Sequence, residues 1–149
     1  LEQKDPVELD RKETKAMVEK IIADDYVIIK NNLLRHNVLK LGLHIFGYLL
    51  EQIHNRTFVS EEISQEIWDI IKEQQLLDKT VAYVDGIIPV GSKTGGARGI
   101  TCDVALFEGD KPYIISIMAN ETDVPVTDDF MRHLGRDIYK EIYDGSRIY

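Results

Sequence analysis

Cysteine is nearly absent from this sequence, which has 149 residues and a single cysteine, Cys102. An internal disulfide and a cysteine-rich metal site are therefore excluded. Lysine and arginine form no block and the net charge is -8, so a surface for nucleic acid or for an anionic membrane is not expected. The four histidines lack metal-ligand spacing, so no metal ion and no other cofactor is predicted.

Long apolar runs, internal repeats and low-complexity segments are also missing. No run approaches the length of a membrane span, so no membrane-spanning segment is expected. No signal peptide is visible and the first residue is Leu1, which favours a processed form or a piece of a longer polypeptide. No linker divides the chain and its 149 residues can bury a core, so one domain over residues 1–149 is predicted.

The first half of the sequence predicts mainly helices. Residues 9–23 place apolar side chains on one side and charges on the other, and residues 26–29 are rich in β-branched side chains that favour a short strand. The apolar residues of the segment 34–53 are dense and periodic, which predicts a largely buried helix. Ser60 is predicted to cap the next helix, which fades near residues 74–75.

The second half predicts strands. Residues 87–90 are mostly β-branched and lead into a glycine-rich segment. Residues 101–107 alternate between two faces, with Cys102 predicted to be a small buried hydrophobe. The turn residues of 108–112 separate this strand from a second one at 113–119. Together, the two segments are predicted to form an antiparallel hairpin.

A last helix follows the hairpin. Thr127 is predicted to cap it, Asp128 and Asp129 are predicted to occupy its first turn, and Gly145 is a plausible stop. The chain therefore orders helices, then three strands, then a helix. This segregation predicts an α+β fold, an antiparallel sheet with packed helices.

The most informative segment is 92–96, which reads Ser-Lys-Thr-Gly-Gly at the head of a strand-like run. A strand end with a cation, a hydroxyl and a residue without a side chain suits the binding of a carboxylate. The tripeptide Lys-Thr-Gly resembles the third active-site motif of class A-like serine β-lactamases and penicillin-binding proteins. The alternative is a polar strand end followed by a glycine turn.

The context of the motif favours the family. After the motif come an Arg-Gly-Ile step, a strand, a Gly-Asp-Lys-Pro turn, a second strand and a helix, in the order that the family shows. The resemblance extends over residues 43–144. These residues are similar to the C-terminal portion of a β-lactamase-like domain. It implies a β-lactamase-like fold and a secreted or periplasmic location for the parent enzyme, which the sequence itself does not specify.

The resemblance implies a role for each residue of the motif. Lys93 would point its ammonium into the cleft, and Thr94 would offer its hydroxyl to the substrate carboxylate. Gly95 would leave space for a substrate along the strand, and the backbone N–H of Gly96 would be an oxyanion donor. Arg98 would be a second cation for the carboxylate if its loop turns inward, and a solvated loop cation otherwise.

The covalent part of the family's site has no match in this chain. No serine is followed three positions later by lysine, and no asparagine is preceded two positions earlier by serine or tyrosine. Glu51 and Asn55 have the spacing of the family's deacylating loop, but we interpret this as a chance match. No catalytic residue is assigned, and we expect the helical lobe that holds the nucleophile to be reduced or missing, on an absent segment or on another chain.

The resemblance implies a β-lactamase-like serine hydrolase that opens a β-lactam amide through an acyl-serine intermediate without a metal, as in antibiotic resistance. The ligand would be a β-lactam or an acyl-peptide. Two alternatives stay open because the nucleophile motif is absent. In the first, the chain would be a non-catalytic descendant that keeps the fold; in the second, it would be one half of a two-chain enzyme whose helical partner carries the serine.

Overall fold

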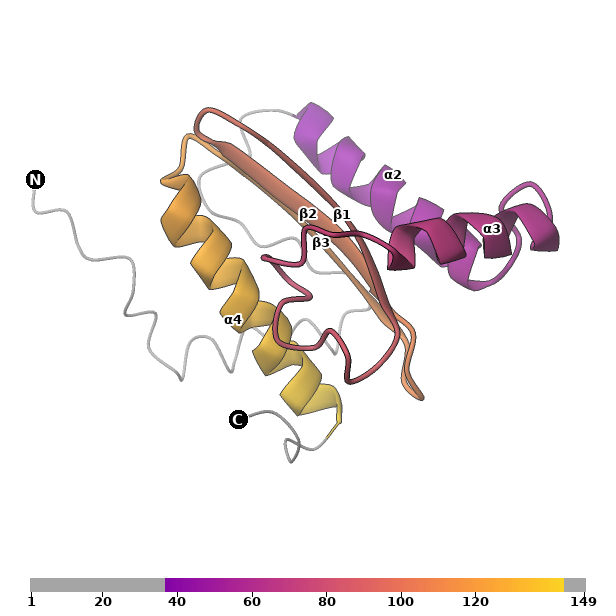
Figure 1. The fold of residues 1–149 in the computed structure, drawn as a ribbon. Coiled ribbons are helices and arrows are strands. Elements are labelled where there is room, and N and C mark those ends of the chain that lie inside the picture. Colours follow the sequence, from indigo (N-terminus) through magenta and orange to yellow (C-terminus); the bar gives the residue numbers. More distant parts are fainter. Residues whose placement is uncertain (1–36, 144–149) are drawn as a thin grey trace, which may run out of the picture.

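The computed structural model describes residues 37–143 (Figure 1). The helix predicted at 9–23, the strand predicted at 26–29 and the stop predicted at Gly145 lie outside the described residues. In the described part of the chain, two helices precede three consecutive strands and a last helix follows them, so the predicted α+β class is confirmed. The elements are α2 (Asn37–His54), α3 (Glu61–Lys72), β1 (Val90–Ala97), β2 (Ile100–Phe107), β3 (Tyr113–Asn120) and α4 (Val124–Ile142).

The three strands form one antiparallel sheet in the order β1-β2-β3. The predicted hairpin is confirmed, since β2 and β3 pair from Phe107 opposite Tyr113 to Ile100 opposite Asn120. On its other side β2 pairs with β1, which contains the whole Lys-Thr-Gly motif and places Lys93 opposite Val104. Among the described residues, β1 is therefore an edge strand, and β2 is the central one.

Helices cover both faces of the sheet, with α4 on one side and α2 and α3 on the other (Figure 1). Both faces can be covered because the side chains of β2 alternate between them, as predicted. Ala105 and Phe107 pack with residues of α4, whereas Val104 and Leu106 pack with residues of α2 and α3. Successive side chains of a strand point to opposite faces, so one strand contributes to two cores.

The starts of two helices test the predicted caps. Ser60 caps α3 as predicted, because its hydroxyl accepts a hydrogen bond from the Ile63 amide at 3.1 Å. The prediction for α4 is wrong: Asp123 is the cap and accepts from the Val126 amide at 3.2 Å, while Thr127 lies inside the first turn. Pro125 explains the earlier start, because its fixed φ suits the first turn of a helix.

The prediction that the segment 34–53 forms a largely buried helix is only half right. The helix α2 forms, and Leu50 and Ile53 are buried against α3 and the sheet. The opposite side of α2 exposes Ile45 and Tyr48, with Tyr48 59% exposed, and Phe46 is exposed as well although it shares the stripe of Leu50 and Ile53. Density of apolar residues alone therefore overestimates burial here, since only part of one stripe of the helix is covered. No helix within residues 37–143 combines the length and apolarity that a membrane crossing requires.

Candidate functional site

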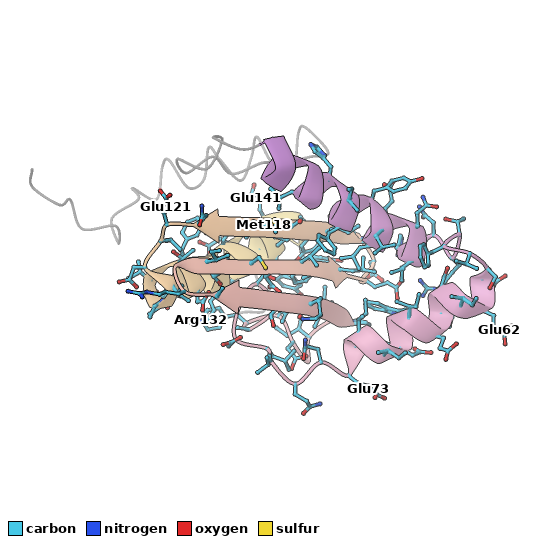
Figure 2. All side chains as sticks on the ribbon, turned by 90° about the horizontal axis from the view of Figure 1, so that it is seen from above. Glu62, Glu73, Met118, Glu121, Arg132 and Glu141 are labelled. Atoms are coloured by element: carbon cyan, nitrogen blue, oxygen red, sulfur yellow. The ribbon has the colours of Figure 1, made fainter. Side chains whose placement is uncertain are left out.

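The side chains of the Lys-Thr-Gly motif divide between the two faces of the sheet. Gly91 lies beneath α3, where an added Cβ would come within 2.6 Å of the Trp68 ring. Lys93 and Gly95 follow at intervals of two and so share this face. In Figure 2, α2 and α3 lie toward one end of the face, away from Glu121. The motif extends toward the Glu121 end, because the register places Gly95 beside Cys102, which in turn lies beside Met118.

The backbone of β1 alternates between its partner strand and its outer edge. The Pro89 carbonyl accepts from the Glu108 amide at 2.8 Å, which marks the odd-numbered residues of β1 as those bonded to β2. The ammonium of Lys79 contacts the carbonyls of both Gly95 (3.1 Å) and Cys102 (3.2 Å), so these carbonyls also lie between the strands. Thr94 and Gly96 therefore direct their N–H and C=O groups to the outer edge, where no described strand pairs with them.

Lys93 reaches the same outer edge. Its side chain is exposed, and its ammonium donates a hydrogen bond to the carbonyl of Thr94. Thr94 is half-buried and leaves the strand on the α4 side, since its partner Asp103 lies in the sheet face toward α4. The structure thus brings the ammonium of Lys93 beside the outward backbone of the motif, with the Thr94 side chain on the other face.

The two glycines of the motif have different surroundings. A Cβ at Gly95 would meet the Cys102 sulfur at 2.7 Å, so the absence of a side chain makes room for Cys102. Cys102 is half-buried and not buried as predicted, because it occupies the part of the sheet face beyond α3. Gly96 is exposed, and Arg98 is exposed in the turn that joins β1 to β2. All five predicted site residues therefore lie in one strand and the turn that follows it.

A buried lysine lies behind the motif, on the side that faces α4. Lys79 is only 7% exposed and belongs to the connection between α3 and β1. Its ammonium donates to the Thr101 hydroxyl at 2.8 Å and lies 3.7 Å from the Asp128 carboxylate. Thr101 in turn donates to Asp128 at 2.5 Å. We call Lys79, Thr101 and Asp128 the buried lysine cluster.

Sequence reasoning does not find the buried lysine cluster. Asp128 is predicted as a first-turn residue that complements the helix dipole, but α4 begins at Val124 and has no acidic residue in its first turn. Asp128 instead pairs with Lys79, and its neighbour Asp129 binds Arg132 at 2.8 Å. The polar Thr101 within a mostly apolar strand was the available signal, since a buried hydroxyl needs a partner.

A second buried acid lies next to the cluster. Asp103 is 2% exposed, and one of its oxygens accepts hydrogen bonds from the Thr80 amide (3.1 Å) and hydroxyl. The other oxygen, Oδ1, has no hydrogen-bond partner. Burial raises the pKa of the Asp103 carboxyl, and the hydrogen bonds from Thr80 and the charge of Lys79 offset this only in part. The Asp103 carboxylate therefore costs the folded state free energy at neutral pH.

We expect Asp103→Asn to change how stability depends on pH. A carboxyl with a raised pKa binds its proton more tightly in the folded state, so the free energy of unfolding falls as pH rises from the ordinary value of about 4 through the folded-state pKa. Asparagine has no such titration, so the difference between wild type and Asp103→Asn should grow across that window and then level off. Urea unfolding followed between pH 3.5 and 8, values chosen about the ordinary pKa, measures this.

Asp69→Asn is the matched control for that experiment. Hydrogen bonds from Lys72 and Gln65 lower the pKa of Asp69, so its contribution is stabilising above the ordinary pKa and is lost as pH falls. The two difference profiles should therefore have opposite signs. A flat difference profile for Asp103→Asn would contradict the raised pKa.

Other candidate groups are accounted for by local contacts. His54 pairs with Glu108 at 3.0 Å, and Arg56 binds the same carboxylate at 3.1 Å. These contacts join the end of α2 to the turn between β2 and β3. Within residues 43–143, whose side chains the structure describes, no three histidines, cysteines or acids are grouped in a way that could hold a metal ion.

Comparison with known proteins identifies the family. The Beta-lactamase enzyme family matches residues 29–142, well over half of the chain. The solved structure of the β-lactamase from Sphaerobacter thermophilus DSM 20745 is similar in fold, with a TM-score of 0.57 and 18% identity. That match covers 64% of this chain and 38% of the other, so this chain spans well under half the length of that enzyme. No curated protein matches. The resemblance predicted from the Lys-Thr-Gly motif is thus confirmed, and the chain belongs to the beta-lactamase enzyme family.

Proposed function

We propose that this chain supplies the substrate-binding wall of a β-lactamase-like serine hydrolase, and that residues 43–144 correspond to the C-terminal part of the enzyme domain. The proposal is supported above all by the outer edge of β1. There the exposed Lys93 ammonium binds the outward carbonyl of Thr94, and the backbone groups of Gly96 point to the same edge. An unpaired strand edge with an adjacent cation matches an extended anionic ligand in both hydrogen bonding and charge.

Each residue of the wall has a stated task. The Lys93 ammonium and the Thr94 hydroxyl would flank the edge from opposite faces and bind the ligand carboxylate. The Gly96 N–H would donate to the oxygen of the β-lactam carbonyl as negative charge develops on it. Arg98, exposed in the next turn, would add a second cation for the carboxylate.

The reaction needs a hydroxyl from outside this wall. That hydroxyl would attack the β-lactam carbonyl, the amide C–N bond would break with its nitrogen taking up a proton, and water would then release the acyl group. No Ser-x-x-Lys is present in the chain, so no residue here is assigned as the nucleophile. The same absence favours two alternatives: a non-catalytic descendant of the family, or one half of an enzyme completed by a helical partner.

Lys93→Ala is expected to weaken the binding of benzylpenicillin by about 10- to 100-fold, because a charge-assisted hydrogen bond contributes about 1.5–3 kcal/mol. Calorimetric titration of the isolated chain measures the affinity. Lys111→Ala is the control, since it removes the same charge from the turn at the other end of the sheet and should leave the affinity unchanged. Equal affinity in wild type and Lys93→Ala would overturn the assignment of Lys93.

Mass spectrometry of the same samples tests whether the chain lacks a nucleophile. After exposure to benzylpenicillin, the chain should keep its mass, because none of its serines has the lysine partner of the family's nucleophile. A stable adduct on any serine would show that a nucleophile has been overlooked. A wild-type chain that binds no benzylpenicillin would contradict the substrate wall and favour the non-catalytic descendant.

A further inference from the structure

The ammonium of Lys79 is placed where the strand edge is built. It contacts the carbonyls of Gly95 and Cys102, which face each other across β1 and β2. This pair lies between Thr94 and Gly96, the two residues whose backbone groups point to the outer edge. The buried side chain of Lys79 therefore contacts, from the α4 face of the sheet, the same part of β1 whose outer edge the proposed ligand would bind.

Burying an ammonium is costly unless every donor is satisfied. Lys79 has three acceptors at 2.8–3.2 Å, which use its three N–H donors, and the Asp128 carboxylate at 3.7 Å supplies the opposite charge. Hydrophobic packing alone would hold the connection before β1 at lower cost. The ammonium at this position is therefore better explained by the carbonyl groups that it holds in place than by a contribution to hydrophobic packing.

The cluster also joins three parts of the fold at this point. Lys79 comes from the connection between α3 and β1, Thr101 from β2 and Asp128 from α4. Thr101 lies opposite Gly96, so the cluster contacts the strand pair at the Gly95–Cys102 position and at the next position, Gly96–Thr101. Displacement of any member would change the position of the Gly96 N–H.

We propose that Lys79 is a positioning residue, whose ammonium holds the pair Gly95–Cys102 so that Thr94 and Gly96 present their backbone groups to a carboxylate-bearing acyl ligand. This inference rests on the proposed function for the ligand, but not for the geometry. Lys79 itself is buried and does not touch the ligand. Its effect passes through the backbone of β1.

The test compares wild type with Lys79→Met/Asp128→Asn, which removes both charges of this ion pair together, so that neither is left without the other. Benzylpenicillin should bind the folded variant about tenfold more weakly, because small misplacement of binding groups is costly. Amide hydrogen exchange at Gly95 and Cys102 should become about tenfold faster, since one supporting contact to each carbonyl is lost. Exchange at Gly91 and Leu106, at the α3 end of the strands, should change less.

A role in overall stability alone would give a different pattern. Exchange would then rise equally at both ends of the strands, and the affinity of the folded fraction would equal that of wild type; this result would overturn the proposal. Lys79→Arg keeps the charge and the donors, so its affinity should lie closer to wild type than that of the double variant. An arginine variant as weak as the double variant would count against positioning by the cation.

The failure of this inference differs from the failure of the proposed function. If wild type does not bind benzylpenicillin, the proposed substrate wall is wrong, and the exchange rates at Gly95 and Cys102 still decide whether Lys79 holds the strand pair. If wild type binds and the double variant binds equally well, the wall stands and Lys79 is not a positioning residue.

Discussion

Gly135→Ala is expected to destabilise the protein by about 3 kcal/mol, because the new methyl group has no space. Gly135 is buried in α4, and a Cβ there would lie 1.9 Å from the Thr80 carbonyl oxygen and 2.8 Å from its carbon. These are backbone atoms, so no side-chain rotation relieves the overlap. The helix α4 would have to move away from the connection that carries Thr80 and Lys79. Urea unfolding of wild type and variant measures the loss.

Gly47→Ala is the matched control for that substitution. Gly47 also lies within a helix, but a Cβ there would meet no atom within 4 Å. Alanine should therefore stabilise α2 by about 0.5–1 kcal/mol through its higher helix propensity. If Gly135→Ala is no less stable than Gly47→Ala, the close approach of α4 to Thr80 is not as the structure describes it.

The second large effect concerns the contact between α3 and the start of the motif strand. Trp68→Ala is expected to cost about 3–5 kcal/mol, because it removes a large buried side chain and leaves a cavity. Trp68 is 2% exposed and packs with Leu50, Val104 and Leu106. Gly91 lies directly under its ring, where an added Cβ would come within 2.6 Å of Trp68 and 2.9 Å of Ile71.

A double-mutant cycle tests this contact sharply. Gly91→Ala alone should destabilise by about 1–3 kcal/mol, because the methyl group overlaps the Trp68 ring. In the background of Trp68→Ala the same methyl group enters the space that the ring vacates, so its cost should fall markedly. Unfolding free energies of the four proteins of the cycle provide the measurement, and additive costs for the two substitutions would show that Gly91 and Trp68 are not in contact.

The sequence predicts local features of this fold well. Residues 101–107 alternate, and the structure places Val104 and Leu106 in one core and Phe107 in the other, as period-two patterning requires. Ser60 caps α3 because the capping bond spans only three residues, which a local pattern can reveal. The motif at 93–95 indicates the family from the sequence alone, since its residue types and the hairpin that follows are adjacent in the chain.

The same local reasoning fails where packing decides. The wrong cap predicted for α4 is a different case, because the feature that favours Asp123 over Thr127 is the nearby Pro125, which is itself local. Cys102 lies on an apolar face of β2, yet α2 and α3 cover only the other end of that face, so its side chain is half-buried. The exposed side of α2 is likewise a matter of which neighbours lie beside it, and no periodicity within the helix specifies them.

Residue type and spacing by themselves determined the order of the elements, the pairing of the hairpin and membership of the family, because each depends on residues a few positions apart. Only the tertiary structure decided that Lys79 and Asp128 meet on the α4 face of the motif strand. It also decided that the backbone N–H and C=O groups of Thr94 and Gly96 point to the outer edge of the sheet. The physical reason is that a buried charge is tolerated only where distant segments supply its partners, and the register of paired strands sets which backbone groups are left at the edge.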